Sequence, residues 1–123
     1  KSFEDLNFTI TRKPEIVNSL SNVIENAYQH AKSKITIKMS LSGENVILEI
    51  IDNGNGFPAD ILPILGEPYV KKNEIDHSGM GLGLFIAKNL INKSLGKIEF
   101  INLVNEGACV RISWKKDNLI LSQ

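Results

Sequence analysis

Two glycine-rich segments contain the residues of this sequence that are best suited to chemistry. The first reads Asp52-Asn53-Gly54-Asn55-Gly56 and the second reads Gly79-Met80-Gly81-Leu82-Gly83-Leu84, and six of the nine glycines lie between Asp52 and Leu84. Such clustering indicates backbone that takes φ > 0 or approaches another group closely. A predicted strand over 46–51 precedes the first segment and a predicted helix over 84–91 follows the second. Because the first N–H groups of a helix are unpaired, this arrangement suits a phosphate-bearing ligand.

Polar side chains on a second predicted helix form another group of candidates. Residues 15–31 carry apolar side chains at spacings of three and four, with a polar stripe beside them made of Asn22, Asn26, Gln29 and His30. Asparagine is a poor helix former, so two of them four residues apart need a reason. They are either incidental amides on a solvated surface or carbonyl oxygens aimed into a pocket, and the spacing alone does not decide between the two.

Four further side chains each have two interpretations. Asp52 ends a predicted strand beside two glycines, where it either braces a turn or accepts a hydrogen bond from a ligand amine. Lys71 and Lys72 either contact phosphate or are simply solvated. Cys109 is the single cysteine, so it cannot form an internal disulfide, and it is either a structural residue of a strand or a reactive thiol.

The elements that must position these residues follow from alternation and helical periodicity. The pattern predicts strands over 6–10, 35–41, 46–50, 98–101 and 109–114, and helices over 15–31, 58–65 and 81–95. Gly96 is predicted to stop the last helix, and the tail from Lys115 is expected to fray. Residues 66–78 show little periodicity, and a loop of that length is typical of a lid over a site.

The composition describes one ordinary globular domain. The 123 residues, 42% of them hydrophobic and 23% charged, are enough for a core. Fourteen basic and fourteen acidic side chains cancel, so no net field favours nucleic acid or an anionic membrane. No apolar run is long enough to span a bilayer, and no signal peptide is visible. The chain begins at Lys1 without an initiator methionine, so we expect residues 1–123 to be a domain excised from a longer protein.

Three common glycine or metal motifs do not fit. A dinucleotide-binding fingerprint needs a strand directly before its first glycine, whereas Asp76-His77-Ser78 precedes Gly79 here, and no suitable acidic residue follows. A P-loop needs Gly-Lys-Ser/Thr, which is absent. Neither His30 nor His77 has a cysteine or acidic neighbour at metal-ligand spacing, which argues against zinc.

Four segments together resemble the Bergerat ATP-binding fold shared by the gyrase, Hsp90, histidine kinase and MutL superfamily. Residues 22–31 resemble its N box, residues 52–57 its G1 box, Glu67-Pro68-Tyr69 its F box and residues 78–84 its G2 box. The order and spacing match over nearly the whole chain. The resemblance implies a two-layer α/β sandwich, with a mixed, mainly antiparallel sheet of about five strands and three helices on one face.

Within that superfamily the chain is most similar to the catalytic domain of a two-component sensor histidine kinase. Hydrolysing members have a glutamate where this sequence has Asn22, and an amide cannot activate water. The segments 66–69 and 106–108 are similar to redox-responding kinases of the RegB kind. The resemblance therefore implies transfer of the γ-phosphoryl group of ATP to a protein histidine.

The resemblance also implies a role for each matching residue. Asn26 would offer its side-chain oxygen to Mg²⁺, and Asn22 would line the same catalytic region. Asp52 would accept a hydrogen bond from the adenine 6-amino group, with Gly54 and Gly56 closing around the base. Gln29 departs from the usual Lys or Arg, and Lys71 or Lys72 could supply that charge. The full predicted ATP site comprises Asn26, His30, Asp52, Gly54, Gly56, Tyr69, Lys71, Lys72, Gly79, Met80, Gly81, Leu82, Gly83 and Leu84.

The partners implied by the resemblance lie outside the chain. A dimeric helical domain bearing the phosphoacceptor histidine should precede Lys1, a response regulator should act downstream, and the whole protein should be a homodimer. This domain would be cytoplasmic, with the whole protein attached to the inner membrane. Two rival functions remain: a serine kinase of the anti-sigma-factor type, which uses the same fold, and a nucleotide-sensing module without transfer, which the neutral Gln29 motivates.

Overall fold

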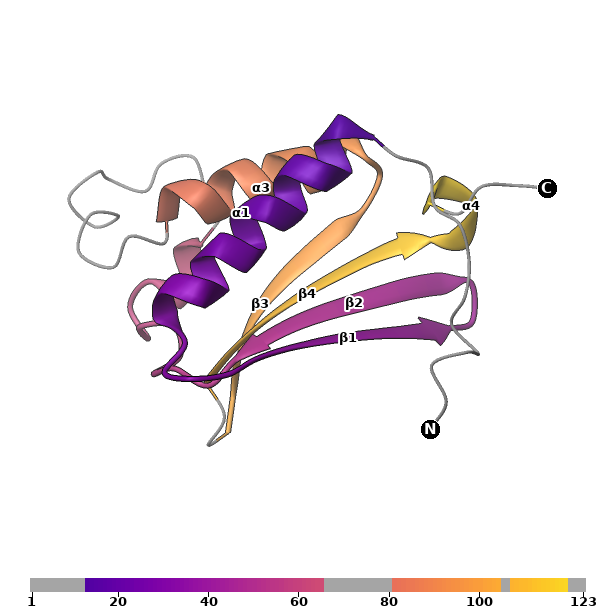
Figure 1. The fold of residues 1–123 in the computed structure, drawn as a ribbon. Coiled ribbons are helices and arrows are strands. Elements are labelled where there is room, and N and C mark those ends of the chain that lie inside the picture. The colour runs from indigo at the N-terminus through magenta and orange to yellow at the C-terminus, as the bar shows by residue number, and fades with distance from the viewer. Residues whose placement is uncertain (1–12, 66–80, 105–106, 120–123) are drawn as a thin grey trace.

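All strand pairs of the described sheet are antiparallel. The computed structural model describes residues 13–65, 81–104 and 107–119. Within them, four strands lie in the order β1-β2-β4-β3 (Figure 1). Their bounds are β1 Ile35–Ser42, β2 Asn45–Asp52, β3 Lys97–Leu103 and β4 Gly107–Lys115. The predicted α/β sandwich is confirmed, while the fifth strand expected over 6–10 falls outside the described residues.

Two helices cover one face of the sheet. Helix α1 spans Pro14–His30 and helix α3 spans Gly81–Lys93, and the two lie side by side over the strands (Figure 1). Pro14 stands in the first turn of α1, where its missing N–H costs nothing. Most of the predicted apolar stripe of α1 points into the core between the layers, whereas Ile24, expected on the same stripe, is 39% exposed. The core is made of Ile16, Val23, Ala27, Val46, Ile50, Phe57, Leu65, Leu84, Ala87, Ile91, Ala108, Val110, Ile112 and Trp114.

Strand register places the alternating residues as predicted. Ile37 faces Ile50 and Leu41 faces Val46 across the β1–β2 hairpin, so their side chains share the helix-covered face. In β2 and β4 these positions are buried by α1 and α3. In β1, which is the last strand of the described sheet on that side, Ile37 and Leu41 stay exposed because neither helix reaches over them.

Two predicted helical features differ in detail. Residues 58–65 form turns with a single 3-10 turn at Leu62–Ile64, in place of a regular helix. In this segment the backbone carbonyl of Pro58 accepts the N–H groups of Ile61 and Leu62. Part of the tail that was expected to fray forms the short helix α4, Lys116–Leu119, where Lys116 donates its N–H to the carbonyl of Glu44. Residues 120–123 lie outside the described residues.

The end of α3 is also built differently from the prediction. The helix ends at Lys93, and the left-handed residue after it is Leu95, with φ 67°, although Gly96 was expected to serve as the stop. Gly96 instead donates its N–H to the carbonyl of Ile91. Non-glycine residues rarely take this conformation, so the surrounding contacts must hold it there. One of them is the buried bond from Trp114 Nε1 to Ser94 Oγ, at 3.0 Å.

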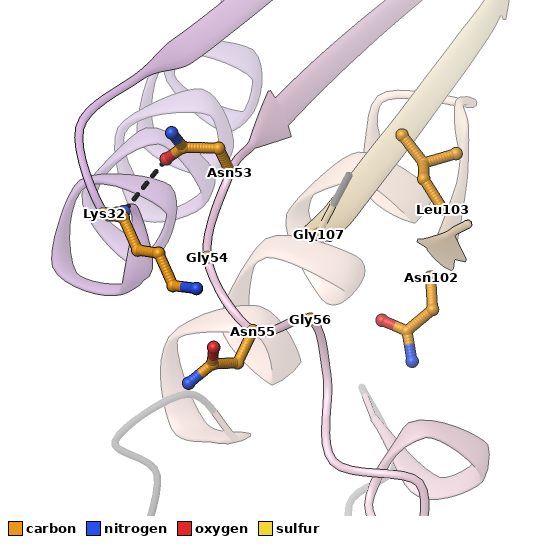
Figure 2. Close-up of a pocket in the computed structure, with 8 residues that line it drawn as sticks. All are labelled: Lys32, Asn53, Gly54, Asn55, Gly56, Asn102, Leu103 and Gly107. Atoms are coloured by element: carbon orange, nitrogen blue, oxygen red, sulfur yellow. Dashed lines mark hydrogen bonds between the residues drawn. The ribbon is translucent and has the colours of Figure 1, made fainter. Parts of the chain in front are cut away.

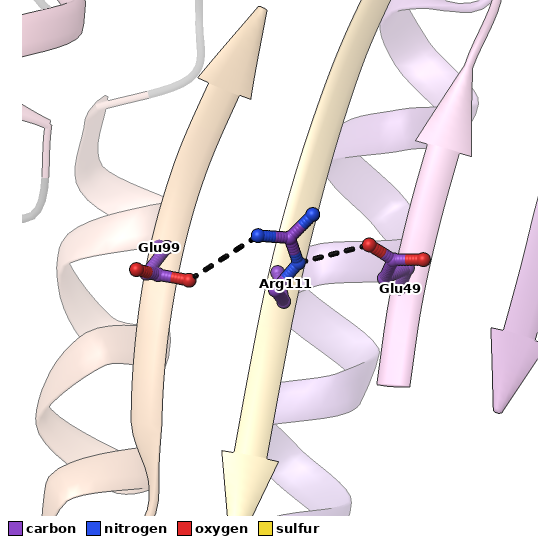
Figure 3. A network of polar contacts seen from close by, with 3 residues as sticks. All are labelled: Glu49, Glu99 and Arg111. Carbon is purple, nitrogen blue, oxygen red and sulfur yellow. Dashed lines mark hydrogen bonds and ion pairs between the residues drawn. The ribbon is translucent and has the colours of Figure 1, made fainter. Parts of the chain in front are cut away.

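The opposite face of the sheet, which neither α1 nor α3 covers, carries a group of charged side chains. Arg111 on β4 lies between Glu49 on β2 and Glu99 on β3, at 2.9 and 3.7 Å (Figure 3). The hydrogen bond with Glu49 raises the pKa of Arg111 further. Because the three side chains are partly solvated, each pair stabilises the fold by less than about 1 kcal/mol. No helix within the described ranges is both long and apolar enough to cross a membrane.

Candidate functional site

Three predicted segments meet at one end of the helix layer. Helix α1 brings Asn22 and Asn26, the end of β2 brings Asp52, and the first turn of α3 brings Gly83. A Cβ atom at position 83 would lie 3.9 Å from Oδ1 of Asn22, so the N-box helix and the glycine-rich helix start are neighbours. The packing of α1 against α3 therefore joins segments about 60 residues apart, as the site requires.

Asp52 braces the turn that follows it. Its side chain is 4% exposed, and its Oδ1 accepts the N–H of Gly54 at 2.8 Å. The first of the two interpretations of Asp52 is therefore observed. A carboxylate can accept about four hydrogen bonds, so this one bond leaves acceptor capacity for a ligand.

Glycine is required at both positions of the turn for different reasons. At Gly54 a side chain would collide with the backbone carbonyl of His30, at the end of α1. At Gly56 the backbone has φ 84°, and a Cβ atom would lie 2.8 Å from Oδ1 of Asn102. The turn is therefore packed tightly against α1 on one side and against β3 on the other.

Two buried polar atoms near this turn have no hydrogen-bond partner within the described ranges. They are Oδ1 of Asn26, whose side chain is 6% exposed, and Nε2 of His30. Leaving a buried polar group unpaired costs about 1–3 kcal/mol. Such groups need an explanation, and a bound ligand or ion is a common one. Of the two interpretations of the α1 amides, a solvated surface is thus excluded for Asn26.

An open cavity of about 390 Å³ runs along the turn. Figure 2 shows its polar lining, with Asn53 and Asn55 on one side and Asn102 on the other. Among the predicted site residues that the structure describes, Gly54 and Gly56 line it, whereas Asn26 and Asp52 do not. The cavity therefore does not include the buried amide of Asn26. Within the described residues its lining is Lys32, Asn53, Gly54, Asn55, Gly56, Asn102, Leu103 and Gly107.

Asn53 holds the start of the turn, a role that the sequence did not predict. Its Oδ1 accepts the backbone N–H groups of Lys32, Ser33 and Lys34 at 2.9, 3.0 and 3.1 Å. Its Nδ2 donates to Oγ of Ser33 at 2.9 Å. The amide thus ties the end of β2 to the segment that leaves α1. A signal existed in the Asp-Asn-Gly run, which is turn chemistry, but nothing in it points to a partner about 20 residues upstream.

Asn102 holds the other end of the turn and was also missed. Its Oδ1 accepts the N–H of Phe57 at 2.7 Å, and its Nδ2 donates to the carbonyl of Phe57 at 2.9 Å. In the sequence it is one polar residue among the alternating residues of a strand, so no local pattern marks it.

The remaining predicted residues fall into three groups. Gly81 and Leu82 begin α3, whereas Leu84 is fully buried in the core, so its side chain does not reach the cavity. Asn22 donates its Nδ2 to the carbonyl of Asn18 at 3.1 Å. Outside the described residues lie Tyr69, Lys71, Lys72, Gly79 and Met80, together with the expected lid.

Gln29 takes no part in this arrangement. It is exposed on α1 and donates to Oε2 of Glu25 at 3.2 Å. Its neutral side chain is therefore engaged with a neighbour on its own helix, and the charge that a phosphate would need at this place has to come from elsewhere.

A sandwich of this kind, with a strand-end aspartate, a glycine turn and a buried amide on the neighbouring helix, is the arrangement expected of a nucleotide-binding domain. The profile of the family described as "Histidine kinase-, DNA gyrase B-, and HSP90-like ATPase" matches residues 12–118. The chain belongs to that family.

Curated relatives are sensor kinases that are much longer than this chain. The sensor histidine kinase RegB of Cereibacter sphaeroides is 33% identical over 131 aligned positions, covering 91% of this chain and 28% of RegB. The sensor protein kinase PilS of Pseudomonas aeruginosa is 31% identical, covering 77% of this chain and 19% of PilS. The chain thus spans about a quarter of these relatives, and the similarity to RegB agrees with the prediction.

Solved structures agree with the fold. The mycobacterial sensor histidine kinase MprB superposes with a TM-score of 0.69 at 20% identity, covering 87% of this chain and 74% of that one. The nucleotide-free catalytic domain of histidine kinase ThkA gives 0.69 at 23% identity, covering 83% and 66%. The architecture is therefore that of histidine kinase catalytic domains.

Proposed function

We propose that this domain binds Mg·ATP and donates the γ-phosphoryl group to a histidine on an adjoining helical dimerisation domain of a sensor kinase. The observation that carries the proposal is the buried and unpartnered Oδ1 of Asn26, on the N-box helix of a chain from this family. An oxygen kept in this state costs free energy in the unliganded fold, and a ligand that pairs with it recovers that cost.

The residues fit a magnesium ion at the phosphate end. Mg²⁺ takes hard oxygen ligands and is bound by few protein groups together with substrate phosphates. Asn26 offers one such oxygen, and when bound the ion would neutralise charge on the phosphates. Asn22, one helical turn earlier and facing Gly83, lines the same region.

Asp52 would recognise the base. Its Oδ1 is already held by the N–H of Gly54, so the orientation of the carboxylate is fixed before any ligand arrives. The remaining acceptor capacity suits the adenine 6-amino group, which is a donor. Because the carboxylate is buried, a mismatched base would leave it unpaired, and this gives selectivity.

The domain is proposed to transfer phosphate and not to hydrolyse ATP. Asn22 stands where hydrolysing relatives place a glutamate, and an amide cannot take a proton from water near neutral pH. Phosphoryl transfer depends mainly on positioning and electrostatics, which the turn and the helix starts supply. A response regulator, a homodimeric whole protein and attachment to the inner membrane belong to the same proposal.

Labelling with γ-³²P-ATP tests the proposal. The domain alone should bind the nucleotide, release little phosphate and label nothing; adding a helical domain with an acceptor histidine in trans should give acid-labile label. Transfer should be weak, because tethering normally supplies an effective concentration in the millimolar range. Rapid phosphate release would favour a hydrolysing relative, and acid-stable label on an added protein would favour a serine kinase. Binding with no transfer at all would favour nucleotide sensing, consistent with the neutral Gln29.

A further inference from the structure

Asn102 uses both ends of its side-chain amide to bond the backbone of a single distant residue, Phe57. Its bonds to the N–H and the carbonyl of Phe57, at 2.7 and 2.9 Å, connect residues 45 positions apart. One donor and one acceptor aimed at the same residue is the pairing that a neighbouring antiparallel strand would give. The side chain therefore continues the hydrogen bonding of β3 onto the residue that ends the glycine turn.

The ring of Phe57 is fixed by the same strand. Phe57 is 3% exposed, and its ring meets that of Phe100 edge-on, with centroids 6.0 Å apart and planes at 83°. Phe100 and Asn102 are two residues apart on β3, so their side chains share one face of the strand. Phe57 is held by its ring in the core and by its backbone on Asn102.

The turn between the two anchors has little freedom left. Asn53 fixes its start through three backbone N–H groups, and Asn102 fixes its end at Phe57, which leaves only 54–56 between them. Oδ1 of Asn102 also fills the space that a side chain at Gly56 would need. A turn held in this way is preorganised, so a ligand does not have to order it.

We propose that Asn102 is a positioning residue for the base end of the nucleotide site. It acts through the turn, because both ends of its side-chain amide are bonded to Phe57. The inference rests on the proposed function, in which Asp52 binds the adenine amine while its Oδ1 is bonded to Gly54. Loss of the Asn102 bonds frees the end of the turn, Gly54 moves with it, and the carboxylate is no longer aimed. Recognition of the base should therefore suffer more than binding of the phosphates.

The test compares ADP with inosine diphosphate, which carries an oxo group in place of the 6-amino group. Calorimetric titrations are made on the wild type, on Asn102→Ala and on Asn92→Ala, an exposed α3 amide with no side-chain hydrogen bond in the described ranges. The wild type should prefer ADP. In Asn102→Ala, ADP should bind about tenfold more weakly and inosine diphosphate much less so, and the preference should shrink toward one. Asn92→Ala should keep both affinities.

The outcomes separate the inference from the proposed function. If Asn102→Ala weakens both nucleotides equally, or neither, the residue has only a structural role and the inference is overturned. If the wild type does not bind ADP, or does not prefer it to inosine diphosphate, the result contradicts the proposed function itself. Should the alanine variant not fold, Asn102→Asp is measured by the same criterion, since it keeps the acceptor for the Phe57 N–H and loses the donor to the carbonyl.

Discussion

Two pairs of asparagines, one at the glycine turn and one on α1, differ in how their amides are used. Asn53 and Asn102 have both amide ends bonded, although both side chains lie toward the surface. Asn26 is buried deeply, yet its Oδ1 has no partner within the described residues, and its neighbour Asn22 uses only its Nδ2. Exposure alone would predict the reverse pattern of hydrogen bonding. Water can pair with the surface amides, so they need no protein partner, whereas a buried amide does need one.

The difference separates amides that build the site from amides that serve a ligand. A bonded amide contributes to the stability of the fold, so its removal should cost unfolding free energy with or without nucleotide. An unpaired buried amide oxygen costs free energy in the empty fold, so its removal should not destabilise the empty protein but should weaken the liganded state. Each variant below breaks or sharpens that contrast.

The largest effect is expected for Asp52→Asn, because Asp52 braces the turn and is also proposed to bind the adenine amine. The asparagine can keep Oδ1 as the acceptor for Gly54, so the fold should survive. The NH₂ group of the new amide would face the 6-amino group of adenine, however, so that two donors would meet. A mispaired buried polar group costs about 1–3 kcal/mol, and more if it is charged. Calorimetry should show that the affinity for a non-hydrolysable ATP analogue falls by about tenfold to a hundredfold. Unchanged affinity would remove Asp52 from the binding site.

Asn53→Ala should show the second largest effect, on stability. Three backbone N–H groups lose their common acceptor, which should cost about 1–3 kcal/mol and lower the thermal midpoint by roughly 5–10 °C. The matched variant is Asn55→Ala, two residues along the same turn, where the exposed side chain makes no hydrogen bond in the described part of the chain. Equal melting temperatures for the two variants would contradict the assignment of Asn53 as an anchor.

The smallest effect concerns Cys109, which faces away from the helices beside Ile51. Burial raises the pKa of its thiol, with Glu49 adding to the rise. The folded state therefore disfavours the thiolate, so alkylation by iodoacetamide should be slow in the native protein at pH 8 and fast after unfolding. Since the folded pKa is the higher one, this group stabilises the fold fully below its unfolded pKa and loses that contribution as the pH rises through the folded pKa. Rapid native labelling would revive the reactive-thiol interpretation.

Local patterns in the sequence predicted helices α1 and α3 and the four described strands, whereas the helix expected over 58–65 was wrong. These signals lie within a few neighbouring residues: the apolar spacing of α1, the alternation in β1 and β2, and the polar side chains of Asp52 and Asn26. The family resemblance connects them into one site. The connections that tighten the turn are not local. Asn102 finds Phe57 only after the sheet has formed, and the left-handed Leu95 depends on the packing of Ser94 and Trp114. Such contacts form only in the tertiary structure, and no periodic pattern in the sequence indicates them.

The most direct test of this contrast is Asn26→Ala, measured for stability and for nucleotide affinity. Without nucleotide, its unfolding free energy should fall by no more than about 1 kcal/mol, because the buried oxygen that is lost has no hydrogen-bond partner within the described residues. Its affinity for a non-hydrolysable ATP analogue should fall much more in Mg²⁺ than in EDTA, since the oxygen is proposed to serve the ion. Equal losses of affinity in Mg²⁺ and EDTA, or destabilisation as large as that of Asn53→Ala, would contradict the assignment and make Asn26 a structural amide.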